Sequence, residues 1–209
     1  MKKVSYKRIA ILMVGLMGFS CVKETSEAEL VASPELTAVE LDMMKYMMEE
    51  EKLAYDVYVT LYEQFGLATF NNIAKSELSH MNAASKLLEK YGVENTASTT
   101  LGVFNDEHLQ SLYNALIAQG SWSLVDALKV GATIEDVDIY DLEDFMEKTE
   151  NEDIHSVFDF LDCGSRNHLR SFINQLTIQG AVYSPQYISQ EHFDAILTGD
   201  KETCGTYTL

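Results

Sequence analysis

Four long segments of helical periodicity, separated by glycine or by a short polar break, dominate this 209-residue chain. Apolar residues recur in them at intervals of three and four, which is the pattern of an amphipathic helix with one buried stripe. No stretch alternates apolar and polar residues convincingly enough to indicate a strand. We therefore predict an all-α protein with long helices at 37–65, 69–91, 121–148 and 151–179.

The lengths of the connections predict how these helices pair. Gly66 ends the first segment, and only a few residues separate the first from the second and the third from the fourth. Each close pair should form an antiparallel hairpin. The connection between the pairs is long and carries its own helical segment at 106–119. Two hairpins joined by one long crossover predict a ferritin-like four-helix bundle over residues 37–197, followed by a C-terminal tail at 198–209.

The N-terminus has the features of an export signal. Four basic residues among the first eight precede an apolar run at 9–19, which is too short for a permanent membrane span. A small residue, Ser20, then precedes Cys21, which resembles the lipoprotein box of bacterial lipoproteins. We predict a signal peptide at 1–20, lipidation of Cys21, an acidic tether at 21–36, and a location in the bacterial cell envelope. An ordinary secretory signal or an uncleaved anchor is the alternative.

Charge and cysteine content limit the partners of the chain. The 33 Asp and Glu residues exceed the 15 Lys and Arg residues, so the formal net charge is −18. Because binding to nucleic acid needs basic side chains against the phosphates, we expect no nucleic-acid partner. Cys163 and Cys204 form either a disulfide or two separate thiols, and neither lies in a zinc-binding pattern. The predicted partners are metal ions and, through Cys21, a membrane; a homodimer is left open.

Each of the four long segments interrupts its apolar stripe with polar residues near its middle. A lone histidine on such a stripe is more often a satisfied core residue than a ligand, and a lone carboxylate is often solvated. Interruptions in all four helices together point instead to a shared site. Glu49, Lys52 and Asp56 fall on the opposite face of the first segment, which we expect to meet solvent. The interrupting residues are Glu51 (with Glu50 as an alternative), Glu77, His80, Glu135, Asp138 and His168.

Several carboxylates on buried stripes are costly because each loses its hydration and repels the others. A shared cation makes such an arrangement tolerable. Carboxylate oxygen and imidazole nitrogen without thiolate suit iron, manganese or zinc. We therefore predict one or two metal ions between the helices.

The chain resembles an uncharacterised prokaryotic family of ferritin-like domains, over about residues 38–195. That family has no firmly assigned activity, so the resemblance implies a fold rather than a reaction. The runs that carry the resemblance are EEEKLAYDVY (49–58), FNNIAKSELSH (70–80), GATIEDVDIYDLE (131–143), NEDI (151–154) and GSRNHLRSF (164–172).

More distantly, the chain is similar to rubrerythrin-type di-iron proteins. The resemblance implies a dinuclear site with Glu77 and Asp138 as bridges and an open face for O₂ or peroxide. One position departs from the pattern, because Ser165 stands where the fourth helix should carry a glutamate. This departure would leave the site one carboxylate short or mononuclear, and Gly164 before it would permit a local helix bulge. The matching positions are Glu51, Ala54, Tyr58, Glu77, His80, Glu135, Asp138 and His168.

Two classes of function remain from the sequence. The first is a redox or ferroxidase-type metal protein, with Tyr55, Tyr58 and Tyr62 as candidate electron donors, although tyrosines on a stripe more often serve packing. The second is a non-catalytic, lipid-anchored interaction domain whose buried polar groups form a network. A hydrolase is poorly supported because no nucleophile elbow or phosphate loop is present.

Overall fold

The computed structural model describes residues 35–209, and within that range it contains six helices and no strand. The all-α prediction is therefore confirmed for this part of the chain. The predicted signal peptide, Cys21 and most of the tether lie outside the described residues. Among the helices that are described, none is both long and apolar enough to cross a membrane. The helices are α1 (Ala38–Phe65), α2 (Ala68–Lys90), α3 (Glu107–Gly120), α4 (Leu124–Met146), α5 (Glu152–Ile178) and α6 (Gln190–Thr198).

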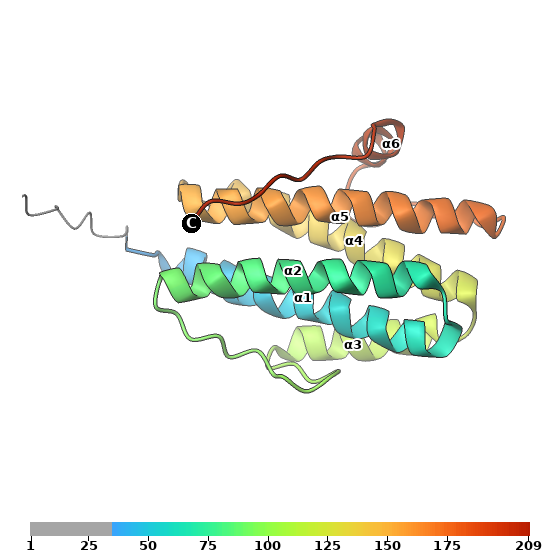
Figure 1. The fold of residues 1–209 in the computed structure, drawn as a ribbon, viewed down its shortest axis with the longest axis horizontal. Coiled ribbons are helices and arrows are strands. Elements are labelled where there is room, and N and C mark those ends of the chain that lie inside the picture. The colour runs from blue at the N-terminus through green and yellow to red at the C-terminus, as the bar shows by residue number, and fades with distance from the viewer. Residues whose placement is uncertain (1–34) are drawn as a thin grey trace, which may run out of the picture. The chain divides into compact units, whose positions relative to one another are not determined.

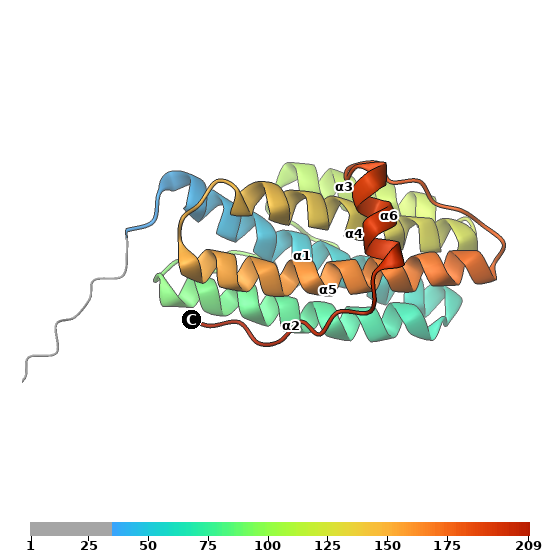
Figure 2. The ribbon, with the colours of Figure 1, turned by 90° about the horizontal axis from the view of Figure 1, so that it is seen from above.

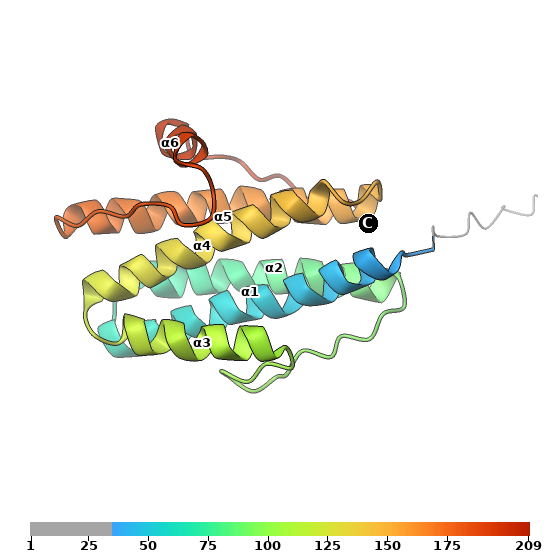
Figure 3. The same cartoon turned by 180° about the vertical axis from the view of Figure 1, so that it is seen from behind.

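The four long helices α1, α2, α4 and α5 lie side by side (Figure 1). α1 packs against α2 and α4 packs against α5, each pair antiparallel as the short connections predict, while α2 also contacts α5 and α1 contacts α4. The shorter α3 runs along α1 and α4 on one side of this group (Figure 3). α6 lies across α5 on another side, and the C-terminal segment then runs back beside α5 (Figure 2).

Side chains at the helix ends fix these boundaries. Thr37 caps α1 in a capping box: its hydroxyl accepts from the backbone N–H of Glu40 at 3.2 Å, and the Glu40 carboxylate accepts from the backbone N–H of Thr37 at 2.8 Å. Gly66 ends α1 at φ 66°, a left-handed conformation that glycine adopts without a steric cost. Ser123 caps α4, because its hydroxyl accepts from the backbone N–H of Asp126 in the first turn. The observed ends lie within a few residues of the predicted ones.

The buried interior consists of two apolar clusters with a polar layer between them. Along α1 the chain passes from the cluster around Met44 to the polar residues 49–52 and then to the cluster around Tyr58. α5 runs from the Met44 cluster, through Phe158, to the Tyr58 cluster, through Phe172. The antiparallel partners α2 and α4 carry the same regions in the reverse order. The polar interruptions of all four stripes therefore meet at one level.

The expectation that Glu49, Lys52 and Asp56 meet solvent is wrong, because all three are buried. The crossover between α2 and α3 packs onto this face of α1. Glu49 accepts a hydrogen bond from the backbone N–H of Asp106 at 3.0 Å, and Lys52 Nζ donates to the carbonyl of Thr100 at 3.0 Å and pairs with Asp56. Periodicity identified this face as polar, but it could not show that a loop covers it.

The C-terminal segment is fastened to α5 by a disulfide and by ion pairs. Cys163 is bonded to Cys204, which decides between the two alternatives left open by the sequence. Close by, the carboxylate of Glu202 accepts from Arg166 Nη2 at 2.6 Å and from Arg170 Nη2 at 2.9 Å. The last residues of the chain are thus held against the helix that carries His168.

The segment between α5 and α6 is anchored on a single buried carboxylate. Asp136 of α4 is fully buried and accepts from the Tyr183 hydroxyl at 2.7 Å. It also accepts from the backbone N–H groups of Gln186 at 2.5 Å and Ile188 at 2.9 Å. Asp136 therefore has a structural role and faces away from the polar layer.

Candidate metal centre

All six side chains predicted to form a site are buried in the polar layer, none of them more than 7% exposed. They come from each of the four long helices. Their contacts differ, and they divide into an inner group and two outer carboxylates. The outer carboxylates are Glu135 and Asp138, and the other four residues form the inner group. The six are Glu51 of α1, Glu77 and His80 of α2, Glu135 and Asp138 of α4, and His168 of α5.

His80 lies between two carboxylates and a glycine. Its Nδ1 is 3.1 Å from Glu51 Oε2 and 2.9 Å from Glu77 Oε2. The opposite edge of the ring lies against Gly164 of α5, where a Cβ atom would be only 2.3 Å from His80 Nε2. α5 is a continuous α-helix here, so Gly164 makes no bulge. Its role is instead to leave room for the imidazole.

His168 completes the inner group from the other hairpin. Its Nδ1 is 2.9 Å from Glu77 Oε1 and 3.4 Å from Glu135 Oε2. Glu77 therefore touches both imidazoles, one with each oxygen, and the two rings are stacked with centroids 5.3 Å apart. One ligand atom from each of Glu77, His80 and His168 lies within 4.8 Å of the others. This buried cluster could hold a metal ion.

Hydroxyl groups hold the two candidate ligands of α4, Glu135 and Asp138. The Tyr58 hydroxyl donates to Glu135, and the Ser165 hydroxyl donates to Asp138. Ser165, at the position where a fourth-helix glutamate was expected, thus orients a carboxylate of α4. Of the tyrosines named from the sequence, Tyr58 contacts the site directly, whereas Tyr62 is 37% exposed.

The electrostatics of the metal-free site favour protonated imidazoles. Burial opposes a charge on His168, but the carboxylates of Glu77 and Glu135 outweigh it and raise the pKa of His168 to about 10. The pKa of His80 is raised well above its ordinary value in the same way, by Glu51 and Glu77 against burial. Burial raises the pKa of Glu51 to about 7, although His80 opposes this shift. The pKa of Glu77 is lowered because its two imidazole partners outweigh its burial.

Several buried carboxylate oxygens receive no hydrogen bond from an N–H or hydroxyl donor. These are both oxygens of Glu50, Oε1 of Glu51, Oε1 of Glu77, Oδ1 of Asp138 and, on α5, Oδ1 of Asp162. A buried acceptor without a donor is costly and calls for an explanation such as a bound ion. Carboxylate and imidazole together fit iron, manganese or zinc, so the residues present fit a metal of this group.

Sequence reasoning did not identify every residue of this region. The structure places Glu51, rather than Glu50, against His80, while Glu50 faces Asp141 of α4. Asp141 was not singled out, although it continues a regular acidic series on α4. Gly164 was expected to permit a helix bulge, but it instead allows α5 to approach His80 of α2 closely. A single sequence contains no pattern that predicts such a contact between two helices.

Comparisons with known proteins give the chain relatives without an assigned activity. A family model described as an uncharacterised protein domain, DUF2202, matches residues 40–200. The uncharacterised protein MJ0754 of Methanocaldococcus jannaschii is 50% identical over 157 residues, which cover 75% of this chain and 85% of that protein. A crystal structure of the hypothetical protein MJ0754 from Methanococcus jannaschii aligns with a TM-score of 0.79 at 48% identity, covering 80% of this chain and 96% of that chain.

Proposed function

We propose that this chain, which belongs to the DUF2202 family of uncharacterised domains, is a metal-binding protein. Its first ion would be held by Glu77, His80 and His168. The observation that carries this proposal is the position of Glu77, whose two oxygens each touch a different imidazole in a buried layer. Neighbouring carboxylates without donors support a site of high negative charge, where a cation would relieve their repulsion.

The remaining carboxylates complete the proposed ligand set. Glu51 and Glu135 contact the imidazoles and lie close enough to contribute oxygen ligands, and Asp138 would serve a second ion. Iron or manganese, when bound, would supply redox chemistry toward O₂ or peroxide. The chain itself would keep Glu135 and Asp138 oriented through the two hydroxyl donors, and the apolar clusters on both sides would limit the access of water.

We also propose that the fold is the ferritin-like four-helix bundle. Its support is the connectivity: two antiparallel hairpins, α1–α2 and α4–α5, joined by a long crossover that carries α3. In bundles of this kind, metal ligands project inward from facing helices, as the six residues do here. A location in the cell envelope, with Cys21 lipidated, stays a proposal; palmitate labelling of exported protein with Cys21→Ala as the control tests it.

The central test is metal binding by the full-length chain. Anaerobic titration with Fe²⁺ should saturate at one or two ions per chain, and the absorbance should change when air is admitted. The variant His80→Ala/His168→Ala should lose this binding. The matched control His108→Ala/His192→Ala also removes two imidazoles, both outside the polar layer, and should bind normally. No binding by the unmodified chain, or equal binding by both double variants, would falsify the proposal.

A second function, a non-catalytic interaction domain with a buried polar network, is favoured by one observation. Each imidazole already has two carboxylate neighbours, so protonated histidines would form ion pairs without any metal. This alternative predicts no metal by elemental analysis and an unchanged melting temperature after treatment with a chelator. The metal-binding proposal predicts a lower melting temperature, because an ion that binds only the folded state stabilises it.

A further inference from the structure

α4 and the residue that follows it carry an acidic residue at every third position, from the buried middle of the helix to its exposed end. A step of three residues falls short of a full helical turn by roughly 60°, so such a series winds slowly around the helix. The first two members are buried, the next two are partly exposed, and the last is exposed. We call this series the acidic spiral, and it consists of Glu135, Asp138, Asp141, Asp144 and Glu147.

The acidic spiral is unfavourable for the stability of α4. Like charges three residues apart repel each other, and negative charge near a helix C-terminus interacts unfavourably with the helix dipole. The last turn of α4 contains no basic residue, and in the following turn only Lys148 pairs with a member of the spiral, Asp144. A chain that keeps such an arrangement at this cost is expected to have a functional reason for it.

A second observation on α1 points to a cation on this path. Glu50 is buried opposite the middle of the spiral, with Asp141 and Asp138 as charged neighbours. Neither oxygen of Glu50 receives a hydrogen bond from an N–H or hydroxyl donor, and Oδ1 of Asp138 also receives none. Glu50 faces the carboxyl group of Asp141 and is next to Glu51 in the chain, so carboxyl groups without an N–H or hydroxyl donor lie beside the inner group.

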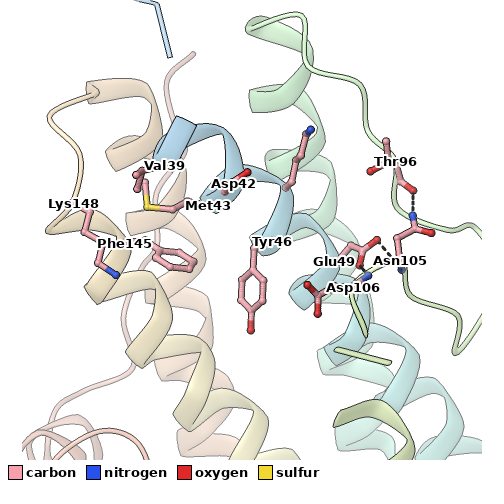
Figure 4. A pocket seen from close by; sticks show the side chains of 11 residues that line it. Val39, Asp42, Met43, Tyr46, Glu49, Thr96, Asn105, Asp106, Phe145 and Lys148 are labelled. Carbon is pink, nitrogen blue, oxygen red and sulfur yellow. Dashed lines mark hydrogen bonds between the residues drawn. The ribbon is translucent and has the colours of Figure 1, made fainter. Parts of the chain in front are cut away.

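A pocket of about 570 Å³ lies between α1, the crossover and the end of α4, and Tyr46 in its lining has Glu50 and Asp141 of the path as charged neighbours. Figure 4 shows Tyr46 in the middle of it, between Phe145 of α4 and Glu49 of α1. Three carboxylates and two ammonium groups contribute to the lining, those of Asp42, Glu49 and Asp106 and those of Lys45 and Lys148. Burial and the charges of nearby carboxylates, Glu50 and Asp141 among them, raise the pKa of Tyr46, so this residue of the pocket lining also lies near the path.

A second opening near the centre has a lining of net positive charge. It is a pocket of about 250 Å³ that reaches His168 and is lined by the basic side chains of Arg170 and Lys201 together with neutral polar residues. A lining of positive charge disfavours a divalent cation, whereas a lining of carboxylates raises its local concentration. The pocket beside Tyr46, in which carboxylates outnumber lysines, therefore favours a divalent cation more than this second opening does.

We propose that divalent cations reach the Glu77–His80–His168 centre from the pocket beside Tyr46, moving along the acidic spiral and past Glu50. This inference rests on the proposed function, since it describes how the same centre is loaded. Asp141 and Glu50 act as a transit site of hard oxygen ligands, which suit Mn²⁺ and Fe²⁺ but bind less selectively than the inner imidazoles. Successive acids of the spiral lie about 4.5 Å apart along the helix axis, because each step is three residues.

The test is the rate of metal loading, with Co²⁺ as the probe because its visible absorbance reports coordination at the centre. Stopped-flow mixing at low ionic strength should show that Asp141→Asn/Asp144→Asn loads on the order of tenfold more slowly. Its final absorbance and stoichiometry should match those of the unmodified chain. The control Glu63→Gln/Glu191→Gln removes two exposed carboxylates elsewhere and should load at the normal rate.

Two further arms separate the possible failures. Lys201→Glu reverses charge at the basic opening and should leave the loading rate unchanged. If this variant instead loads faster while Asp141→Asn/Asp144→Asn loads normally, cations use the basic opening and the proposed route is wrong. An equal slowing by the control pair would mean that net charge alone sets the rate, which also overturns the route. If the unmodified chain does not bind Co²⁺ or Fe²⁺ at all, it is the proposed function that fails.

Discussion

Replacing Gly164 by alanine adds one methyl group at the point where α5 touches His80. The new Cβ would lie 2.3 Å from His80 Nε2 and 2.5 Å from Cε1. Since favourable contacts between such atoms begin near 3.5 Å, the ring must retreat by about 1 Å. Its other edge is already in contact with Glu51 and Glu77 at 3.1 Å and 2.9 Å. The imidazole therefore cannot move without losing its present alignment with these carboxylates.

The energetic consequence can be divided between folding and binding. Alanine in place of glycine favours the helix by about 1 kcal/mol, while overpacking costs about 1–3 kcal/mol. The metal-free variant should therefore lose about 0–2 kcal/mol of unfolding free energy. A displaced ligand should weaken metal binding at least about tenfold, which corresponds to about 1.4 kcal/mol. Urea unfolding of the metal-free protein and calorimetric titration with Co²⁺ measure the two effects separately.

Gly131→Ala supplies the matched control on α4. There the added Cβ would lie 2.4 Å from Phe172 Cε1, so the gain in helix preference and the degree of crowding are similar. The crowded ring is apolar, however, and cannot bind a metal. We expect comparable stability changes in the two variants but weakened binding only in Gly164→Ala. Normal Co²⁺ affinity in Gly164→Ala, or an equal loss in Gly131→Ala, would refute the role assigned to this close approach.

Three further predictions concern the rest of the chain. The folded pKa of His168 lies near 10, above its ordinary value of 6.5, so protonated His168 contributes its full stabilisation below about pH 6.5 and loses it as the pH rises to 10 and above. Urea unfolding of the metal-free protein should show this loss of unfolding free energy, and the loss should be smaller in His168→Gln. Cys163→Ser/Cys204→Ser, which opens a link of sequence separation 41, should cost about 4 kcal/mol of unfolding free energy by the loop-closure relation. Asp136→Ala should cost about 1.5–3 kcal/mol for each charged hydrogen bond that water does not replace, and should speed hydrogen exchange at the Ile188 amide.

Much of the helical architecture could be predicted because local rules and the overall fold agree. Gly66 ends α1 where the sequence placed the break, and a serine before α4 and an asparagine before α5 cap their helices near the predicted starts. The polar interruptions could also be located, because a buried stripe has few positions and a charged residue on it is conspicuous. The structure brings these residues to one level, although their role as metal ligands remains the proposal.

What could not be predicted depends on contacts between segments distant in the chain. Lys52 and Asp56 carry the pattern of a solvated face, and only the path of the crossover shows that they are covered. The space that Gly164 gives to His80 depends on the register between α2 and α5, which periodicity does not determine. Asp141 could have been found, since its spacing from Asp138 repeats the spacing from Glu135 to Asp138.

The double contact of Glu77 means that the two imidazoles do not behave as independent acids. Removing a proton from either one leaves the shared carboxylate to interact more strongly with the other, so the pair releases its protons in linked macroscopic steps. An NMR titration that observes one histidine would therefore show the equilibrium of both. In the same way, an ion that displaces the proton of one imidazole changes the affinity of the second imidazole for its own proton.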